Sequence, residues 1–158
     1  MKIATLLYIK NSRDEYLLIE RSKEPNKGLL SPPGGKLIQE IAETPSGCAV
    51  REAKEECNLD SSPADWKLKG IIAEKNYPGI GNLLIFCYLY GKTTDILPPK
   101  MNEGAFRFVP VSQIFDHELP ETDKLYIWKF VLDDKVKFFS LRIDCSDINN
   151  LVCTIEQS

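Results

Sequence analysis

Short runs of β-branched and aromatic residues, separated by turn-forming residues, recur along most of the chain. This alternation is typical of a protein rich in β-strands. It predicts strands over residues 3–9, 16–20, 67–73, 82–90, 106–109, 137–143 and 150–155. The polar segment 11–15 predicts a hairpin turn between the first two runs, and a long loop over 21–31 follows them.

Two segments have helical patterns instead. One covers residues 45–57, and the other opens at residues 119–120 and runs through Val131. Leu125, Trp128 and Val131 fall on one face of the second helix, which predicts that this face packs in the core. Many strands with two well-separated helices indicate an α/β fold, with a mixed sheet and a helix on each face.

The first predicted helix carries three carboxylates on one side. Glu52, Glu55 and Glu56 are spaced i, i+3 and i+4, so they are neighbours on the helix surface. Like charges at this spacing repel each other, and a hard divalent cation such as Mg²⁺ removes the conflict because it accepts carboxylate oxygens. The alternative is an ordinary solvent-facing surface, in which Arg51 pairs with Glu55 at i, i+4.

A glycine pair before this helix favours the metal-binding interpretation. Gly34 and Gly35 follow two prolines, which predicts a backbone turn that a ligand or a cation can approach closely. The opposite face of the helix, with Val50, Ala53 and Cys57, is small and apolar. We expect this face to pack on the core and to leave the carboxylates outward.

The composition is that of a compact globular protein. A chain of 158 residues with 43% hydrophobic and 27% charged residues fits one domain. The formal charge of −3 offers no basic surface for long nucleic acid. The five cysteines form no C-x-x-C pair, which indicates reduced thiols in a cytoplasmic protein and not a zinc site. The apolar start of the chain is short and interrupted by Lys2, so we expect a strand there and no signal peptide or membrane span.

The charged residues around the first helix follow a known pattern. Seven residues separate Glu43 from Arg51, Glu52 follows directly, and Glu55 and Glu56 come three and four positions after Glu52. In these residues the chain resembles the Nudix hydrolase family, whose box reads G-x5-E-x7-R-E-U-x-E-E-x-G-U, with U a bulky aliphatic residue.

Three positions depart from this box. Seven residues, not five, lie between Gly35 and Glu43, so the loop carries a two-residue insertion. Ala53 is smaller than the usual aliphatic residue. Asn58 replaces the glycine, although asparagine also favours the left-handed conformation that ends a helix. Leu59 fills the last aliphatic position.

The resemblance implies a fold and an activity. The fold is a Nudix-type α/β/α sandwich with a mixed β-sheet and a C-terminal β-hairpin, as a single domain over residues 1–158. The activity is that of a Mg²⁺-dependent hydrolase of phosphoric anhydride bonds, with Mn²⁺ as a substitute ion, in which water attacks a phosphorus atom. The likeness is to the MutT-like branch, which includes nucleoside triphosphate pyrophosphohydrolases and 8-oxo-dGTP diphosphatases.

Carried over position by position, the resemblance also implies roles for the charged residues. Glu52, Glu55 and Glu56 would hold the metal ion, completed by a carbonyl of Gly34 or Gly35, and Glu52 would orient or deprotonate water. Arg51 would pair with Glu43, because a guanidinium makes a rigid two-point brace. Glu103 would be a further metal ligand or an alternative base, or else an exposed loop glutamate.

Contacts to the substrate are expected from four further side chains. Arg21 and Lys36 flank the glycine pair, where they would grip phosphate oxygens, or else remain exposed cations. Tyr77 would stack on a base, or else serve as a turn aromatic. Glu121 is a candidate at the start of the second helix, where its default role, like that of Asp123, is to interact with the helix dipole.

The expected substrate is a small nucleotide, first a nucleoside triphosphate that is cleaved to a monophosphate and pyrophosphate. The alternatives are a nucleoside diphosphate-sugar or ADP-ribose hydrolase and a non-catalytic module that senses a nucleotide. Leu119 and Thr122 stand where the oxidised-purine branch has a tryptophan and an aspartate, and Ser31 stands in place of an asparagine. We therefore expect weak selectivity for oxidised bases, in a protein that is a monomer or a homodimer.

Overall fold

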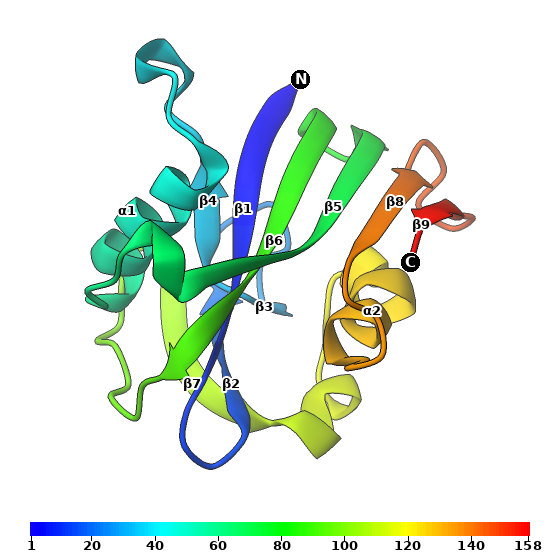
Figure 1. Ribbon diagram of the computed structural model, residues 1–158. Helices are drawn as coiled ribbons and strands as arrows, with labels where there is room; N and C mark the ends of the chain where they lie inside the picture. Colours follow the sequence, from blue (N-terminus) through cyan, green and yellow to red (C-terminus); the bar gives the residue numbers. More distant parts are fainter.

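A mixed β-sheet forms the centre of the protein (Figure 1), whose computed structural model describes all 158 residues. The strands run in the order β3-β2-β1-β6-β5-β8-β9, while β4 and β7 pair with β1 and β2. Their bounds are β1 (Lys2–Lys10), β2 (Glu15–Arg21), β3 (Leu30–Ser31), β4 (Gly34–Lys36), β5 (Trp66–Tyr77), β6 (Gly81–Thr93), β7 (Gly104–Pro110), β8 (Phe139–Asp144) and β9 (Val152–Gln157).

Helices cover both sides of this sheet. The helix α1 (Pro45–Cys57) lies on one side, and the continuous helical segment made of η4 (Asp123–Ile127) and α2 (Trp128–Leu132) lies on the other (Figure 1). The short helices η1 (Gln39–Ile41), η2 (Pro63–Asp65) and η3 (Val111–Asp116) sit in the connections. The predicted α/β/α layering is confirmed, and the antiparallel pair β8–β9 is the predicted C-terminal hairpin.

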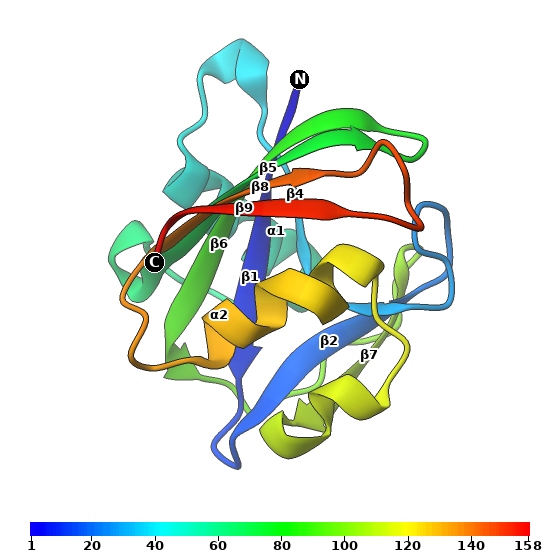
Figure 2. The same cartoon turned by 90° about the vertical axis from the view of Figure 1, so that its right-hand side faces the viewer.

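The sheet opens between β1 and β2. These two strands are paired only next to their turn, at Lys10 and Tyr16, and then diverge (Figure 2). From there β1 runs parallel to β6, whereas β2 pairs with β7 in the antiparallel direction. The separation leaves room for a cavity between the two halves of the sheet.

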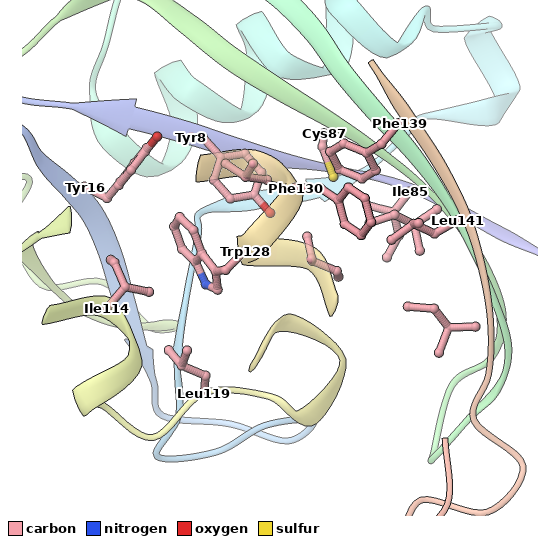
Figure 3. Close-up of a cluster of buried hydrophobic side chains, with 14 of the residues drawn as sticks. Tyr8, Tyr16, Ile85, Cys87, Ile114, Leu119, Trp128, Phe130, Phe139 and Leu141 are labelled. Carbon is pink, nitrogen blue, oxygen red and sulfur yellow. The ribbon is translucent and has the colours of Figure 1, made fainter. Parts of the chain in front are cut away.

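Each helix packs on its own hydrophobic cluster. Ala49 and Ala53 of α1 contact the cluster that contains Leu7 and Leu17 on one face of the sheet. On the other face Trp128 is fully buried, and its ring meets Tyr8 edge-to-face with 5.1 Å between ring centroids (Figure 3). The small residues of α1 bring its backbone close to β1 and β4, which positions the acidic side of the helix.

The second helix differs from the prediction. Residues 123–127 form a π-helical turn, in which Trp128 N–H donates to the Asp123 carbonyl five residues earlier. The wider turn changes the angular spacing of the side chains. Trp128 and Val131 are buried as expected, but Leu125 is 44% exposed, so its assignment to the core was wrong. Asp123 is instead turned inward and only 6% exposed.

The glycine pair also adopts a different structure from the predicted turn. Gly34 and Gly35 belong to β4, which pairs with β1 in the antiparallel direction. The helix that follows has the predicted bounds. Thr44 caps its N-terminus, since its side chain accepts from Gly47 N–H at 3.0 Å. Asn58 ends it in the left-handed conformation with φ of 50°, as expected for the residue that replaces the glycine of the box.

The remaining expectations about the chain concern cysteines and membranes. All five cysteines are free thiols, and four of them are buried. None of the helices combines the length and apolar character needed to cross a membrane.

Candidate active site

A cavity of about 450 Å³ lies where β1 and β2 separate. Its lining comes from β1, β2, β5, β6, the β3–β4 segment, the last turn of α1, and the residues before and at the start of η4. The β2–β3, β5–β6 and β6–β7 loops also contribute. Seven of the predicted site residues line it: Arg21, Gly34, Gly35, Lys36, Glu56, Tyr77 and Glu103. This volume is in the range of small-molecule sites, about 300–1,000 Å³.

Close backbone approach explains the two glycines. A Cβ on Gly34 would lie 2.0 Å from the carbonyl oxygen of Thr5, which is part of the neighbouring strand. A Cβ on Gly35 would lie 2.2 Å from Oε1 of Glu52. The first glycine therefore lets β4 pair with β1, and the second brings the main chain against a carboxylate of α1.

Arg51 connects the helix to the loop before it. Its Nε–H donates to Oε1 of Glu43 at 2.7 Å, and Nη2 donates to Oε2 at 3.0 Å and to the Lys36 carbonyl at 2.9 Å. Glu43 in turn accepts from the Ile38 N–H at 2.8 Å. The hydrogen bond from Arg51 lowers the pKa of Glu43, while Glu43 raises the pKa of Arg51. The predicted pairing is present and holds the inserted loop on α1.

The same guanidinium reaches two carboxylates of the acidic helix face, which consists of Glu52, Glu55 and Glu56. Nη1 of Arg51 donates to Oε1 of Glu52 at 2.8 Å and to Oε2 of Glu55 at 3.2 Å. The salt-bridged arrangement considered as an alternative is thus present between Arg51 and Glu55, whose side chain is 60% exposed. Arg51 uses one oxygen of each carboxylate, so the second oxygen of Glu52 and of Glu55 is left for another ligand.

Burial shifts the pKa of Glu52 and of Glu56 above that of an exposed glutamate. Burial raises the pKa of Glu52, against the opposing effect of its hydrogen bond from Arg51. Burial, followed by the negative charge of Glu52, raises the pKa of Glu56 to about 8. The charge of Glu103 contributes in the same direction. These carboxylates are close enough to repel one another, and no side-chain cation cancels the charge of Glu56 by an ion pair.

The chemistry of these groups fits a hard divalent cation. The candidate donors are carboxylate oxygens and the carbonyl of Gly35, which are the ligands that Mg²⁺ prefers. The Cβ-free face of Gly35 lies directly against the Glu52 carboxylate. The predicted ligands are nevertheless not assembled, because no three acidic, histidine or cysteine side chains converge on one point. Side-chain rotation of Glu52, Glu55 or Glu103 would be needed to bring a third carboxylate to a common ion.

Of the other side chains predicted to contact the substrate, Arg21 and Tyr77 lie in the cavity and Glu121 does not. Arg21 and Tyr77 line the cavity but are tethered by the loop between β2 and β3. Arg21 Nε donates to the Pro25 carbonyl at 2.7 Å, and the Tyr77 hydroxyl donates to Oδ1 of Asn26 at 2.9 Å. Glu121 is exposed and lies outside the cavity lining, contrary to its assignment as a substrate contact.

Most residues of the cavity lining were not assigned to the site from the sequence, and three of them are buried polar residues next to one another in the cavity wall or across from it. Glu74, Thr122 and Asp123 line the cavity and are only 3%, 2% and 6% exposed. The predicted strand ended at Ala73, although strict alternation from the buried Ile72 points to Glu74 as the next inward position. Asp123 could not have been found by this type of reasoning, because the π-helical turn that buries it leaves no repeating pattern.

Comparisons with known proteins agree with this architecture. The chain matches the NUDIX domain family over residues 1–130. A MutT protein from Bacillus halodurans superimposes with a TM-score of 0.81 at 19% identity, covering 99% of this chain and 98% of that one. A MutT protein from Methanosarcina mazei Go1 has a TM-score of 0.66 at 22% identity, with coverage of 82% and 88%.

A third similar structure is the NUDIX domain of Shewanella oneidensis NrtR complexed with ADP ribose. It has a TM-score of 0.65 at 16% identity, with coverage of 82% of this chain and 84% of that one. At these identities the structural neighbours establish the fold, and the match to the family model establishes the family. Because that match spans most of the chain, including the glycine pair and the acidic helix, the protein belongs to the NUDIX family and is a Nudix hydrolase.

Proposed function

We propose that the protein is a Mg²⁺-dependent pyrophosphohydrolase that cleaves the diphosphate linkage of a small nucleotide. The reaction is the conversion of a nucleoside triphosphate to a monophosphate and pyrophosphate. The observation that carries this proposal is that one cavity joins Glu56, Glu103 and the glycine strand to a half-apolar space lined by Ile80 and Leu83. The first group of residues would bind the phosphates through a metal ion, and the second offers apolar surface to a base.

The roles of the charged residues follow from their contacts. Glu52, Glu55, Glu56 and Glu103, with the Gly35 carbonyl, would hold the ion, which supplies charge neutralisation at the phosphate oxygens when bound. Glu52 is the candidate base. Its Oε1 accepts from Arg51, which fixes the carboxylate, and its second oxygen is left to accept a proton from water as the water oxygen forms a bond to phosphorus. Breaking of the phosphoric anhydride bond then releases pyrophosphate.

Arg51 and Glu43 act as a positioning pair in this proposal. Their two-point hydrogen bond connects α1 to the loop that carries Lys36, so it fixes the distance between the acidic helix face and the phosphate-side cations. Lys36 is exposed at the cavity edge and Arg21 is half-buried, which suits contacts to phosphate groups that remain partly hydrated.

A second candidate function is hydrolysis of ADP-ribose or a nucleoside diphosphate-sugar. It is favoured by the similarity to the NrtR NUDIX domain, which is complexed with ADP ribose. A third candidate function is a module that binds a nucleotide without cleaving it, since the same NrtR domain is complexed with ADP ribose. The complete set of Glu52, Glu55 and Glu56 favours catalysis, because binding alone requires no base on the helix.

Product analysis across a nucleotide panel tests these alternatives. Wild-type protein and Glu52→Gln are incubated with nucleoside triphosphates, ADP-ribose and nucleotide-sugars in Mg²⁺, and the products are separated by ion-exchange chromatography. Release of pyrophosphate from triphosphates by the wild type alone supports the proposal. Cleavage of ADP-ribose only would replace it with the second function, and binding without any product would replace it with the sensing module.

A further inference from the structure

One hydrogen bond connects the two halves of the sheet across the cavity. Tyr77 ends β5, which belongs to the half that contains β1, β6 and β8. Asn26 lies in the loop of residues 22–29, which leaves β2 in the other half. The Tyr77 hydroxyl donates to Oδ1 of Asn26 at 2.9 Å, and both residues line the cavity. We call this hydrogen bond the Tyr77–Asn26 tie.

The loop of residues 22–29 has no other hydrogen bond to the half of the sheet that contains β5. The Ser22 N–H donates to the Glu103 carbonyl at 2.8 Å, and the Ser22 hydroxyl donates to the Asn102 carbonyl at 2.6 Å. Both acceptors precede β7, which pairs with β2. The remaining hydrogen bonds of the loop are made with Arg21 or inside the loop itself. The Tyr77–Asn26 tie is therefore what connects the loop to β5.

Both ends of the tie are suited to it. Tyr77 packs against the larger hydrophobic cluster, and burial raises its pKa to about 12, so its hydroxyl stays protonated near neutral pH. A tyrosine hydroxyl in such surroundings needs a hydrogen-bond partner. Asn26 has a φ of 65°, a left-handed conformation that asparagine adopts more readily than most residues. Glycine also adopts this conformation, but it would offer no side-chain oxygen to Tyr77.

We propose that Asn26 is a positioning residue of the nucleotide site. Through the tie it fixes the Tyr77 ring as one wall of the cavity and holds the loop of residues 22–29 against β5, so that a bound nucleotide is retained between them. This role rests on the nucleotide binding proposed above and adds the contact that retains the ligand. The tie involves neither the acidic helix face nor the glycine strand, so it affects binding and not the chemical step.

Steady-state kinetics on Tyr77→Phe tests this role, because the substitution removes only the hydroxyl. ATP, GTP, CTP and UTP are assayed separately in Mg²⁺. We expect KM to rise about 3–10-fold for every triphosphate that the wild type cleaves, which is the effect of one ordinary hydrogen bond, with kcat within about twofold. Tyr126→Phe is the matched control, since the Tyr126 hydroxyl donates to the Leu151 carbonyl at 3.3 Å outside the cavity lining. Its KM should equal that of the wild type.

A double-mutant cycle assigns the change in KM to the tie. Asn26→Gly keeps the left-handed backbone and removes the side-chain oxygen. Both single substitutions break the same bond, so adding Tyr77→Phe to Asn26→Gly should raise KM no further than Asn26→Gly alone. An unchanged KM in Tyr77→Phe, or additive effects of the two substitutions, would overturn the role of Asn26.

Limited proteolysis measures the position of the loop without any ligand. Trypsin cleaves after lysine, and Lys23 and Lys27 are exposed in the loop. We expect cleavage at these two sites to be about 3–10-fold faster in Tyr77→Phe than in the wild type and Tyr126→Phe, because the loop opens more often once the tie is lost. Equal cleavage rates in the three proteins would show that the tie does not hold the loop.

Failure of the proposed reaction gives a different result from failure of the tie. Faster cleavage of Tyr77→Phe by trypsin, without pyrophosphate release from any triphosphate by the wild type, rejects the reaction and retains the tie as the anchor of the loop. Pyrophosphate release with the same KM in the wild type and Tyr77→Phe rejects the role of Asn26 and retains the reaction.

Discussion

Arg51 and Glu43 form a two-point ion pair, with Nε to Oε1 at 2.7 Å and Nη2 to Oε2 at 3.0 Å. The Glu43 side chain is only 8% exposed, so the pair is largely shielded from water. It joins the middle of α1 to the end of the loop that contains the two-residue insertion relative to the Nudix box. The insertion therefore changes the length of the loop without detaching it from the helix.

Removing this pair is expected to affect both stability and activity. Arg51→Ala leaves the Glu43 carboxylate buried without its partner, which should lower the free energy of unfolding by roughly 2–4 kcal/mol. Urea denaturation measures this change, and kcat should fall as well because the loop loosens. Arg13→Ala is a suitable control, since Arg13 is 78% exposed and its ion pair with Glu15 is 3.6 Å long. Equal small effects of the two substitutions would contradict the bracing role.

Glu52→Gln is expected to lower the catalytic rate without lowering the stability of the fold. The amide oxygen can still accept the hydrogen bond from Arg51 that Oε1 accepts at 2.8 Å, so the thermal midpoint should stay nearly unchanged. Loss of the proton acceptor should lower kcat by at least ~10²-fold. Steady-state kinetics on the best triphosphate measures this effect. Near-wild-type turnover would move the role of base to Glu103, and Glu103→Gln is the variant to compare.

Substitution of Gly34 should mainly affect stability, and substitution of Gly35 should mainly affect activity. Gly34→Ala forces a Cβ against the backbone oxygen of Thr5, which cannot move without breaking the pairing of β4 with β1. We expect a loss of about 1–3 kcal/mol in unfolding free energy. Gly35→Ala meets the side chain of Glu52 instead, which can rotate away. It should retain more stability but lose roughly 10–100-fold in kcat, since the candidate base is displaced. The reverse order of effects in urea denaturation and kinetics would refute this assignment.

Glu74 and Asp123, the two buried carboxyl groups of the cavity, should make stability depend on pH. The pKa of Glu74 is about 8 in the folded protein and 4.5 ordinarily, and that of Asp123 is about 7 against 3.8. Between these values the folded state binds more protons than the unfolded state, so the free energy of unfolding falls as pH rises from about 4 to about 8. Glu74→Gln should remove part of this slope.

Thermal unfolding at pH 5 and pH 8 measures that change. At pH 8, Glu74→Gln is expected to be more stable than the wild type by roughly 1–3 kcal/mol, and the difference should shrink at pH 5. The exposed control Glu24→Gln should follow the wild-type curve. A curve for Glu74→Gln that runs parallel to the wild type over this range would show that the carboxyl group is not held neutral by burial.

Selectivity for oxidised purines is expected to be weak. Leu119 belongs to the hydrophobic core and is absent from the cavity lining, so it offers no stacking surface in place of a tryptophan. We predict a preference for 8-oxo-dGTP over dGTP below ~10-fold in kcat/KM, which is under about 1.4 kcal/mol. Competition assays with both nucleotides decide this, and a preference of 100-fold would indicate a further group that reads the oxidised position.

The fold class and the acidic helix were determined by the sequence alone. Local signals specify them: alternating hydrophobic residues predict strands, and the spacing of Glu52, Glu55 and Glu56 on a helix follows from its 3.6-residue period. The pairing of Arg51 with Glu43 was also predictable, because their separation matches the box. In each case the relevant residues are close in sequence, so local geometry is sufficient.

Tertiary structure decided the rest of the site. Gly34 and Gly35 form a strand because β1 provides their hydrogen-bond partners. The local sequence around the glycines does not predict this pairing. Glu74 and Asp123 come from segments 49 residues apart, and they meet in one cavity only because β1 and β2 diverge and η4 forms a π-helical turn. Burial of these carboxyl groups depends on surfaces contributed by several strands at once. This long-range packing raises the pKa of both carboxyl groups, and neither segment's sequence alone predicts the burial that causes it.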